Sequence, residues 1–197
     1  MTSSPIVQLH QIAEVRMGVT LRGRDATRPA RHGACFMIRI GDLSDDGQLD
    51  SDDLHQFEPG EDIKPDYFLR PGDVLLPNRG TRCTAYVYDL SLTNVLVGAQ
   101  FYIVRPDTAK VSAEFLAWFL RTEKAASHFA LRRKGTLVQT VQRKDVLELE
   151  LPLPPLPKQH QITALDALTI QERQLSIELA QTKATYLQRA MLHAASA

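Results

Sequence analysis

Leu151-Pro152-Leu153-Pro154-Pro155-Leu156-Pro157 divides the chain into two parts of different composition. So many prolines in one stretch cannot support a regular ladder of backbone hydrogen bonds, which predicts a rigid connector over 152–157. Residues 158–195 contain neither proline nor glycine and consist mainly of strong helix formers. The sequence therefore predicts a folded domain over 1–151, a connector over 152–157 and a long helical arm over 158–197.

Apolar residues recur along the predicted arm at steps of three, four and seven, which places them on one stripe of a helix. Glu172 and Thr182 interrupt this stripe. A helix of this length spans roughly 55 Å at 1.5 Å per residue, so we expect it to bury the stripe against a partner helix as a coiled coil. The predicted interface residues are Ile162, Leu165, Leu168, Leu175, Leu179 and Tyr186.

The part before the connector has the pattern of an α+β domain that is rich in strands and contains a few helices. Ser112 is a suitable N-cap for a helix that ends near Gly135. Trp118 lies on this helix and is expected in the hydrophobic core of the domain rather than stacked on a DNA base. Pro71-Gly72-Asp73 predicts a tight turn. Short runs of β-branched, aromatic or alternating residues predict strands over 35–40, 74–76, 84–88, 95–104 and 147–151.

The charges are balanced but segregated. The chain has 23 basic and 23 acidic residues, so its formal net charge is zero, and a uniformly basic nucleic-acid binder is excluded. The region 16–39 is rich in arginine, the region 42–66 is strongly acidic, and a second basic stretch spans 132–144. Any binding of DNA therefore depends on local basic surfaces.

Three segments combine cations with amide or hydroxyl side chains, which is the chemistry of DNA recognition. Lysine and arginine contact phosphates, arginine also pairs with guanine, and glutamine or asparagine pairs with adenine. The third segment has an equally good interpretation as a solvated helix end whose cations interact with the helix dipole. The predicted DNA-binding residues are Arg22, Arg24, Arg28 and Arg31; Asn78, Arg79, Thr81 and Arg82; and Arg132, Arg133, Lys134, Gln139, Thr140, Gln142, Arg143 and Lys144.

The sequence carries no motif of a catalytic class. It lacks the glycine-rich loop and the Asn/Asp-Pro-Pro-aromatic motif of a methyltransferase, and neither Pro-Asp pair is followed by the acid-x-Lys of a restriction nuclease. The histidines are dispersed, and Cys35 and Cys83 are distant from each other, which gives no metal-ligand spacing. We therefore predict a non-enzymatic cytoplasmic protein with reduced thiols, no metal, no cofactor and no membrane segment.

Several motifs follow one another in a defined order, and together they resemble a known family. They are Gly18-Val19-Thr20, Ile38-Arg39-Ile40-Gly41-Asp42-Leu43, Leu69-Arg70-Pro71-Gly72-Asp73-Val74-Leu75, Gly135-Thr136, and Leu153-Pro154-Pro155-Leu156 followed by Gln159 and Ile162. This order resembles the target-recognition domain and following conserved helix of type I restriction–modification specificity subunits, over nearly the whole chain. The proline-rich junction is the most specific element, and Lys158 stands where an acidic residue is common.

The resemblance implies a specificity subunit that recognises double-stranded DNA and positions a methyltransferase and restriction complex on a split site. Full-length subunits of this family resemble two tandem copies of the unit, whereas this chain has one. A second copy that pairs through the arm gives a symmetric homodimer for an inverted-repeat site, or the chain is a stand-alone relative from another defence or modification system. S-adenosylmethionine and ATP belong, by this resemblance, to modification and restriction subunits that dock on the arm.

A non-enzymatic protein–protein adaptor with a coiled-coil arm is the alternative interpretation. The acidic stretch 42–66 suits such a role. Three basic segments favour DNA instead, because an adaptor has no need of them.

Overall fold

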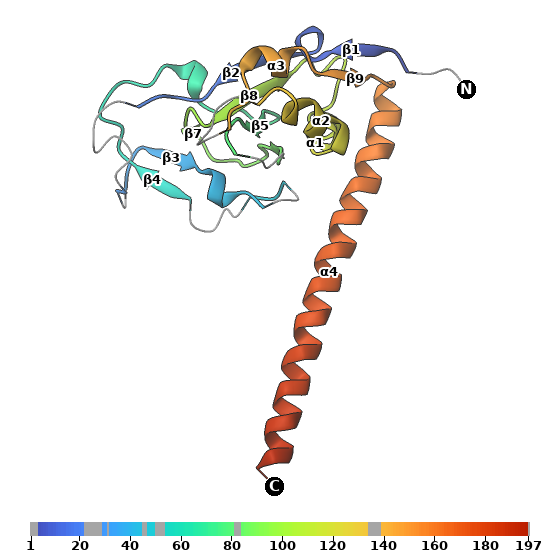
Figure 1. Cartoon of the computed structure of the whole chain (residues 1–197). Coiled ribbons are helices and arrows are strands. Elements are labelled where there is room, and N and C mark those ends of the chain that lie inside the picture. Colours follow the sequence, from blue (N-terminus) through green and yellow to red (C-terminus); the bar gives the residue numbers. More distant parts are fainter. Residues whose placement is uncertain are drawn as a thin grey trace. The chain divides into compact units, whose positions relative to one another are not determined.

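The structure, a computed structural model, describes residues 4–21, 29–30, 32–44, 47–49, 54–80, 84–133 and 139–196. The chain divides into two compact units, Met1–His160 and Gln161–Ala197. The first unit contains the described strands and three short α-helices, and the second consists of most of the helix α4 (Leu156–Ala195), which is continuous over 40 residues (Figure 1). The predicted α+β class with a long C-terminal helix is confirmed.

The larger sheet of the first unit has four strands in the order β2-β8-β5-β6. The strand β8 lies between β2 and β5 and pairs antiparallel with both. The register places Met17 of β2 and Leu76 of β5 opposite the same residue, Tyr102. The strands are β2 (Ala13–Met17), β5 (Val74–Pro77), β6 (Tyr86–Val87) and β8 (Phe101–Pro106).

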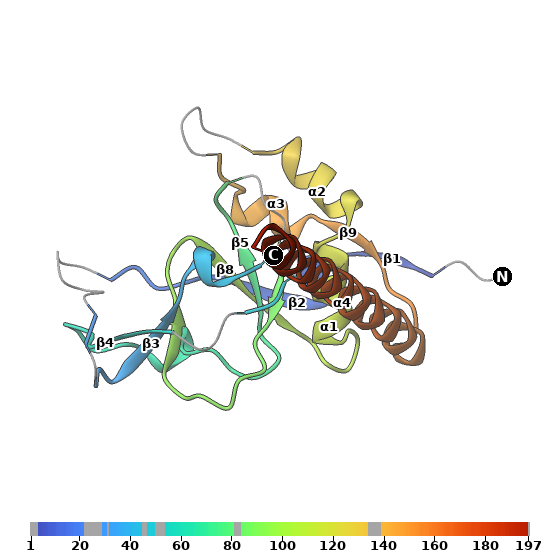
Figure 2. The same ribbon diagram turned by 90° about the horizontal axis from the view of Figure 1, so that it is seen from below.

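A second sheet has the order β4-β3-β7, in which β3 pairs antiparallel with β4 and parallel with β7. In both views β3 and β4 lie at one side of the unit and the helices α1 and α2 at the other (Figures 1 and 2). A third pair joins the first strand to the last, β1 to β9, antiparallel. The strands are β1 (Ile6–Gln8), β3 (Cys35–Ile38), β4 (His55–Phe57), β7 (Val95–Val97) and β9 (Glu150–Pro152).

Both faces of the three-stranded sheet are buried. Val95 and Val97 pack with Leu75 and Phe101 of the four-stranded sheet in one apolar cluster, whereas Leu96 belongs to a second cluster with other residues. Successive side chains of a strand point to opposite faces, so one short strand contributes to both clusters. This explains why β7 consists of consecutive apolar residues rather than an alternating pattern.

The helices of the first unit are short and capped by side chains. Ser112 caps α1 as predicted, since its Oγ accepts a hydrogen bond from the amide of Phe115 at 3.1 Å. Thr122 caps α2 in the same way through the amide of Ala125. The helices are α1 (Ala113–Leu120), α2 (Glu123–Ala130) and α3 (Arg143–Leu147), with 3-10 turns η1 (Leu9–Gln11), η2 (Ile40–Asp42) and η3 (Pro65–Tyr67).

Several boundaries predicted from the sequence differ from the structure. The helix α4 begins at Leu156, inside the connector predicted over 152–157, because a proline in the first turn of a helix, here Pro157, is tolerated. The single strand expected over 95–104 is two strands, because the chain turns at 98–100 between β7 and β8. The helix expected from Ser112 onward is divided into α1 and α2 where Thr122 begins a new helix. The strand expected over 147–151 is shorter and later, since Leu147 ends α3. The last three differences arise where a turn or a cap interrupts a run of suitable propensity.

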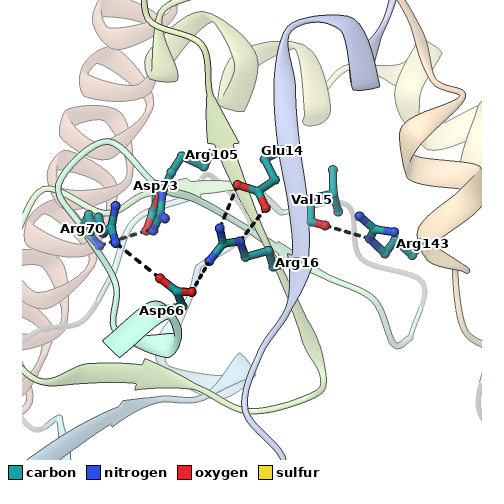
Figure 3. Close-up of polar contacts among 8 residues, drawn as sticks. All are labelled: Glu14, Val15, Arg16, Asp66, Arg70, Asp73, Arg105 and Arg143. Atoms are coloured by element: carbon teal, nitrogen blue, oxygen red, sulfur yellow. Dashed lines mark hydrogen bonds and ion pairs between the residues drawn. The ribbon is translucent and has the colours of Figure 1, made fainter. Parts of the chain in front are cut away.

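The Pro71-Gly72-Asp73 turn is present as predicted and is tied to the four-stranded sheet. Gly72 has a φ of +90°, which favours glycine, and the buried carboxylate of Asp73 accepts a hydrogen bond from the amide of Arg70 at 2.9 Å. The same carboxylate binds the guanidinium of Arg105 in β8 through two bonds of 2.7 Å (Figure 3). This bidentate pair fixes the start of β5 against the end of β8.

Gln159 fixes the beginning of α4 to the first unit. Its side chain is fully buried, its Oε1 accepts from the amide of Ser112 at 2.9 Å, and its Nε2 donates to the carbonyls of Lys110 and Pro154 at 3.0 and 2.8 Å. These backbone groups lie in irregular segments that have no ladder partners of their own. The amide of Gln159 therefore satisfies three backbone groups at once.

We expect the substitution Gln159→Leu to lower the free energy of unfolding by about 2–3 kcal/mol, because it leaves buried backbone donors and acceptors unpaired. Urea unfolding followed by the fluorescence of Trp118 measures this, since Trp118 is the single tryptophan and lies in α1. Gln171→Leu is the matched control on an exposed position of α4. Equal stability of the two variants would contradict the anchoring role of Gln159.

Candidate nucleic-acid interface

The register of the four-stranded sheet places the ends of β2 and β5, after which two of the predicted DNA-binding segments follow in sequence, at one end of the sheet. The last residues of β2 and β5 lie opposite the first residues of β8, because both strands are antiparallel to β8. The first segment follows β2, and the second follows β5. The turn 98–100 enters β8 at the same end. We call this region the loop end of the sheet.

The second and third segments form a short antiparallel ribbon at the loop end. Arg79 pairs with Thr140 in a β-bridge. The amide of Gly80 donates to the carbonyl of Gln139 at 3.0 Å, and the amide of Val141 donates to the carbonyl of Asn78 at 2.9 Å. Segments that are distant in sequence are thus neighbours, and the exposed Arg79 lies directly opposite Thr140.

The first segment is described only near its ends. The amide of Val19 donates to the carbonyl of Val97 at 2.8 Å, and the amide of Ala30 donates to the carbonyl of Gln56 at 2.9 Å. The chain before this segment, at Val19, therefore lies beside the end of β7, and the chain near its end, at Ala30, lies beside β4. The predicted residues outside the described part of the chain are Arg22, Arg24, Arg28, Arg31, Thr81, Arg82 and Lys134, together with Cys83.

Gly18 explains the Gly-Val-Thr motif at the start of this segment. A Cβ atom at this position would overlap the carbonyl oxygens of Val97 and Gly98. The amide of Gly18 donates to the carbonyl of Phe101 at 3.0 Å, so the chain lies close against the turn. A side chain here would separate the two segments.

Asn78 is buried, unlike the other described residues of the second segment. Its side-chain Nδ2 donates to the carbonyl of Ala99 at 2.8 Å, and its backbone amide donates to the carbonyl of Gln100 at 2.9 Å. Asn78 thus joins the ribbon to the turn 98–100 instead of presenting its amide to the surface.

The residues of the third segment differ in their contacts. Arg143 donates from Nε to the carbonyl of Val15 at 2.7 Å, which ties α3 to β2 (Figure 3). Gln142 occupies the N-cap position of α3, and Lys144 lies 3.6 Å from the carboxylate of Glu148. Arg132 is exposed and Arg133 is half-buried at the end of α2. Part of this segment thus holds the fold together, and part of it is accessible.

Several arginines near the sheet are neutralised by acids and therefore contribute little positive potential. Arg16 binds Glu14 at 2.7 Å and lies 3.6 Å from Asp66, which also approaches Arg70 at 3.7 Å (Figure 3). Within the described part of the chain, Arg79 makes no such pair with an acid. An unneutralised cation at the loop end is suited to bind a phosphate.

Glu14 and Arg105 both keep their charges at neutral pH. Hydrogen bonding to Asp73 raises the pKa of Arg105, and hydrogen bonding to Arg16 lowers the pKa of Glu14. A carboxyl with a lowered folded-state pKa stabilises the fold above its unfolded-state pKa and loses this effect as the pH falls through the folded-state pKa. Burial raises the pKa of the free thiol Cys35, so it stays protonated and poorly nucleophilic.

A hollow of about 400 Å³ lies beside the turn 98–100. It is polar in part, since Arg39, His55 and Gln100 contribute to its wall. None of these three was among the predicted DNA-binding residues, and Gln100 lay within the strand predicted over 95–104. Gly98 could have indicated the turn at 98–100 from the sequence, because glycine weakens the interior of a strand. The complete lining is Val19, Thr20, Leu21, Met37, Arg39, His55, Gly98, Ala99 and Gln100.

In the ranges that the structure describes, no three His, Cys, Asp or Glu side chains lie close enough to hold a metal ion together. Among the described helices, none is both long and apolar enough to cross a membrane.

The helix α4 presents apolar side chains that are largely exposed. Every described residue from 171 to 195 is exposed, and Leu165 and Tyr186 are 66% and 71% exposed. Ile162 alone of the predicted interface residues is half-buried. The exposed members of the predicted stripe are Leu165, Leu168, Leu175, Leu179 and Tyr186.

The fold is that of an α+β domain with a long C-terminal helix, and chains of type I restriction–modification systems share it. No protein-family model matches the chain, and no curated protein matches it. A chain from a study of complex assembly and conformational transition of the type I R-M system is similar at a TM-score of 0.66 and 20% identity, over 92% of this chain and 42% of that one.

Two further solved structures carry the similarity to specificity subunits. The HsdS subunit from Thermoanaerobacter tengcongensis gives a TM-score of 0.63 at 22% identity, over 91% of this chain and 40% of that chain. The type I restriction-modification system S subunit from M. genitalium gives a TM-score of 0.57 at 14% identity, over 87% of this chain and 40% of that chain. The chain thus has the fold of part of these subunits and spans about 40% of their length, which confirms the predicted resemblance at the level of fold.

We predict that Arg143→Ala lowers the free energy of unfolding by about 1 kcal/mol, since the bond to the carbonyl of Val15 is lost. Arg143→Lys should lose the same stability although it retains the charge, because lysine has no Nε donor at that place. Arg79→Ala, at an exposed position, should leave stability unchanged. Thermal unfolding of the three variants measures this. If Arg143→Ala has the stability of the wild-type chain, the bond between Arg143 and the carbonyl of Val15 does not stabilise the fold.

Proposed function

We propose that this chain is a non-catalytic DNA-recognition subunit, the specificity half-subunit of a type I restriction–modification system. The observation that carries this proposal is the ribbon at the loop end, in which the described parts of the second and third predicted segments meet and Arg79 is exposed. The similarity in fold to the HsdS and S subunits agrees with it. Such a protein acts on DNA in the cytoplasm and needs no cofactor of its own.

The proposed mechanism divides the loop end into cations that bind phosphates and amides that contact base edges. In this proposal Arg79 and Arg132 contact phosphates, as do the predicted arginines at 22–31 and Arg82. The amide and hydroxyl groups of Gln139, Thr140 and Gln142 extend the same surface towards the bases. Affinity therefore depends on salt, whereas sequence preference depends on the amides.

The proposed assembly uses α4. Two copies that pair through the stripe from Leu165 to Tyr186 give a two-fold arrangement, in which each recognition unit contacts one half of an inverted repeat. The same helix offers a docking surface to a modification subunit and a restriction subunit. An exposed apolar stripe on a 40-residue helix supports this assignment, because an isolated stripe of this kind is unfavourable in water.

We expect Arg79→Ala to weaken binding of a random-sequence duplex and to reduce the slope of log affinity against log salt by about 1, because one phosphate contact is lost. Arg82→Ala should behave similarly. A gel shift at low salt, followed by a salt titration, measures both effects. Lys64→Ala removes an exposed cation outside the three segments and is the control. Unchanged binding by Arg79→Ala would contradict its assignment as a phosphate contact.

The double substitution Leu175→Glu and Leu179→Glu should convert a dimer into a monomer, since it places charges in the proposed helix–helix contact. Ile177→Glu is a matched control: Ile177 is 52% exposed and lies between the two leucines in sequence, but on another face of the helix. Light scattering gives the solution mass of each form. Identical masses for both variants would argue against this stripe as the interface.

The exposed stripe on α4 also favours a second candidate, a protein–protein adaptor that does not bind DNA. The two functions differ in their response to salt. A DNA-recognition subunit loses affinity steeply between low and moderate salt, whereas an adaptor shows no binding to a duplex at either.

A further inference from the structure

Hydrogen bonds fix the backbone of the turn between β7 and β8 at several points. The amide of Phe101 donates to the carbonyl of Gly98 at 3.0 Å and closes the turn. Asn78 binds the carbonyls of both Ala99 and Gln100, as described above. Three hydrogen bonds therefore fix the backbone that carries the Gln100 side chain.

The side-chain amide of Gln100 folds over Gly98. A Cβ atom built at Gly98 would overlap this amide, so the absence of a side chain at Gly98 leaves the space that the amide occupies. Both residues line the hollow at the loop end. Within the described part of the chain, the Gln100 amide makes no hydrogen bond, although Gln100 is half-buried. The donor and the acceptor of this amide are therefore not used within the described part of the chain, and the backbone that carries them is fixed.

The surroundings of Gln100 match the requirements of DNA. The ribbon with Arg79 is joined to the turn through Asn78, and the segment that begins at Val19 lies beside Gly98 through a β-bridge. Arg39 adds a half-exposed cation to the wall of the hollow, with its Nε 3.7 Å from Asp42. Gln100 therefore lies beside the ribbon that carries Arg79 and beside the bridge of Val19, after which the first predicted segment follows in sequence.

We propose that Gln100 is a specificity-determining residue that recognises one adenine of the target duplex, and that Asn78 positions it. A glutamine amide presents one donor and one acceptor, which is the pattern that matches adenine N7 and N6 in the major groove. A side chain on a pinned turn is placed more accurately than one on a long loop, which is what base recognition requires. This inference rests on the function proposed above.

The test is selection of bound sequences from a randomised duplex pool by the full-length chain at low salt. We expect the wild-type chain to enrich a site with at least one fixed adenine. Gln100→Ala should make that position degenerate, preserve the remainder of the site, and lower affinity for the best duplex roughly ten-fold. Gln100→Glu should shift the same position towards cytosine, because a carboxylate accepts from cytosine N4.

Gln174→Ala, on an exposed position of α4 outside the predicted stripe, is the matched control and should enrich the wild-type site. Circular dichroism checks that each variant is folded. Asn78→Ala should reduce the base preference at the same position as Gln100→Ala. Loss of a phosphate contact alone would lower affinity without changing the preference at one position. Enrichment of an identical site with equal affinity by Gln100→Ala would overturn the role of Gln100 and leave the proposed function standing. A folded wild-type chain that enriches no sequence would overturn the proposed function itself.

Discussion

The antiparallel pairing of β8 with both β2 and β5 is the constraint on which the rest of the structure depends. Because one strand is shared, the two chain segments that leave its neighbours must emerge at the same end of the sheet. The ion pair between Asp73 and Arg105 holds the other end of β5 against β8. The described parts of the second and third predicted segments, which are distant in sequence, are neighbours at that end, and the exposed Arg79 lies there although the chain as a whole carries no net charge.

Periodicity and caps were sufficient to predict the α+β class, the long helix, the Ser112 cap and the Pro-Gly-Asp turn. These features depend on local chemistry, which a sequence expresses directly. Gln100 was not predicted, because its neighbours have strand propensity and its importance comes from Asn78, which is distant in sequence. Asn78 and Arg143 were predicted to bind DNA from residue type alone, and their contacts to Ala99 and Val15 depend on tertiary structure.

Neutral amides have a particular role in this fold. Gln159 and Asn78 both bind backbone groups of irregular segments, where no strand or helix satisfies them. An amide both donates and accepts without the desolvation cost of a charge, so it can be buried where a lysine or glutamate would be unfavourable. The motif glutamine after the proline-rich junction thus has a physical explanation that does not involve a ligand.

The anchor of α4 and the loop end lie at opposite ends of β8. Gln159 binds Lys110 and Ser112, just after β8 ends, whereas the loop end lies at the beginning of β8. Substitutions among the loops therefore leave the attachment of the helix undisturbed. Under the proposed function, one preferred DNA sequence is exchanged for another while the assembly surface stays the same, so that diversification of targets and maintenance of the complex are separate evolutionary problems.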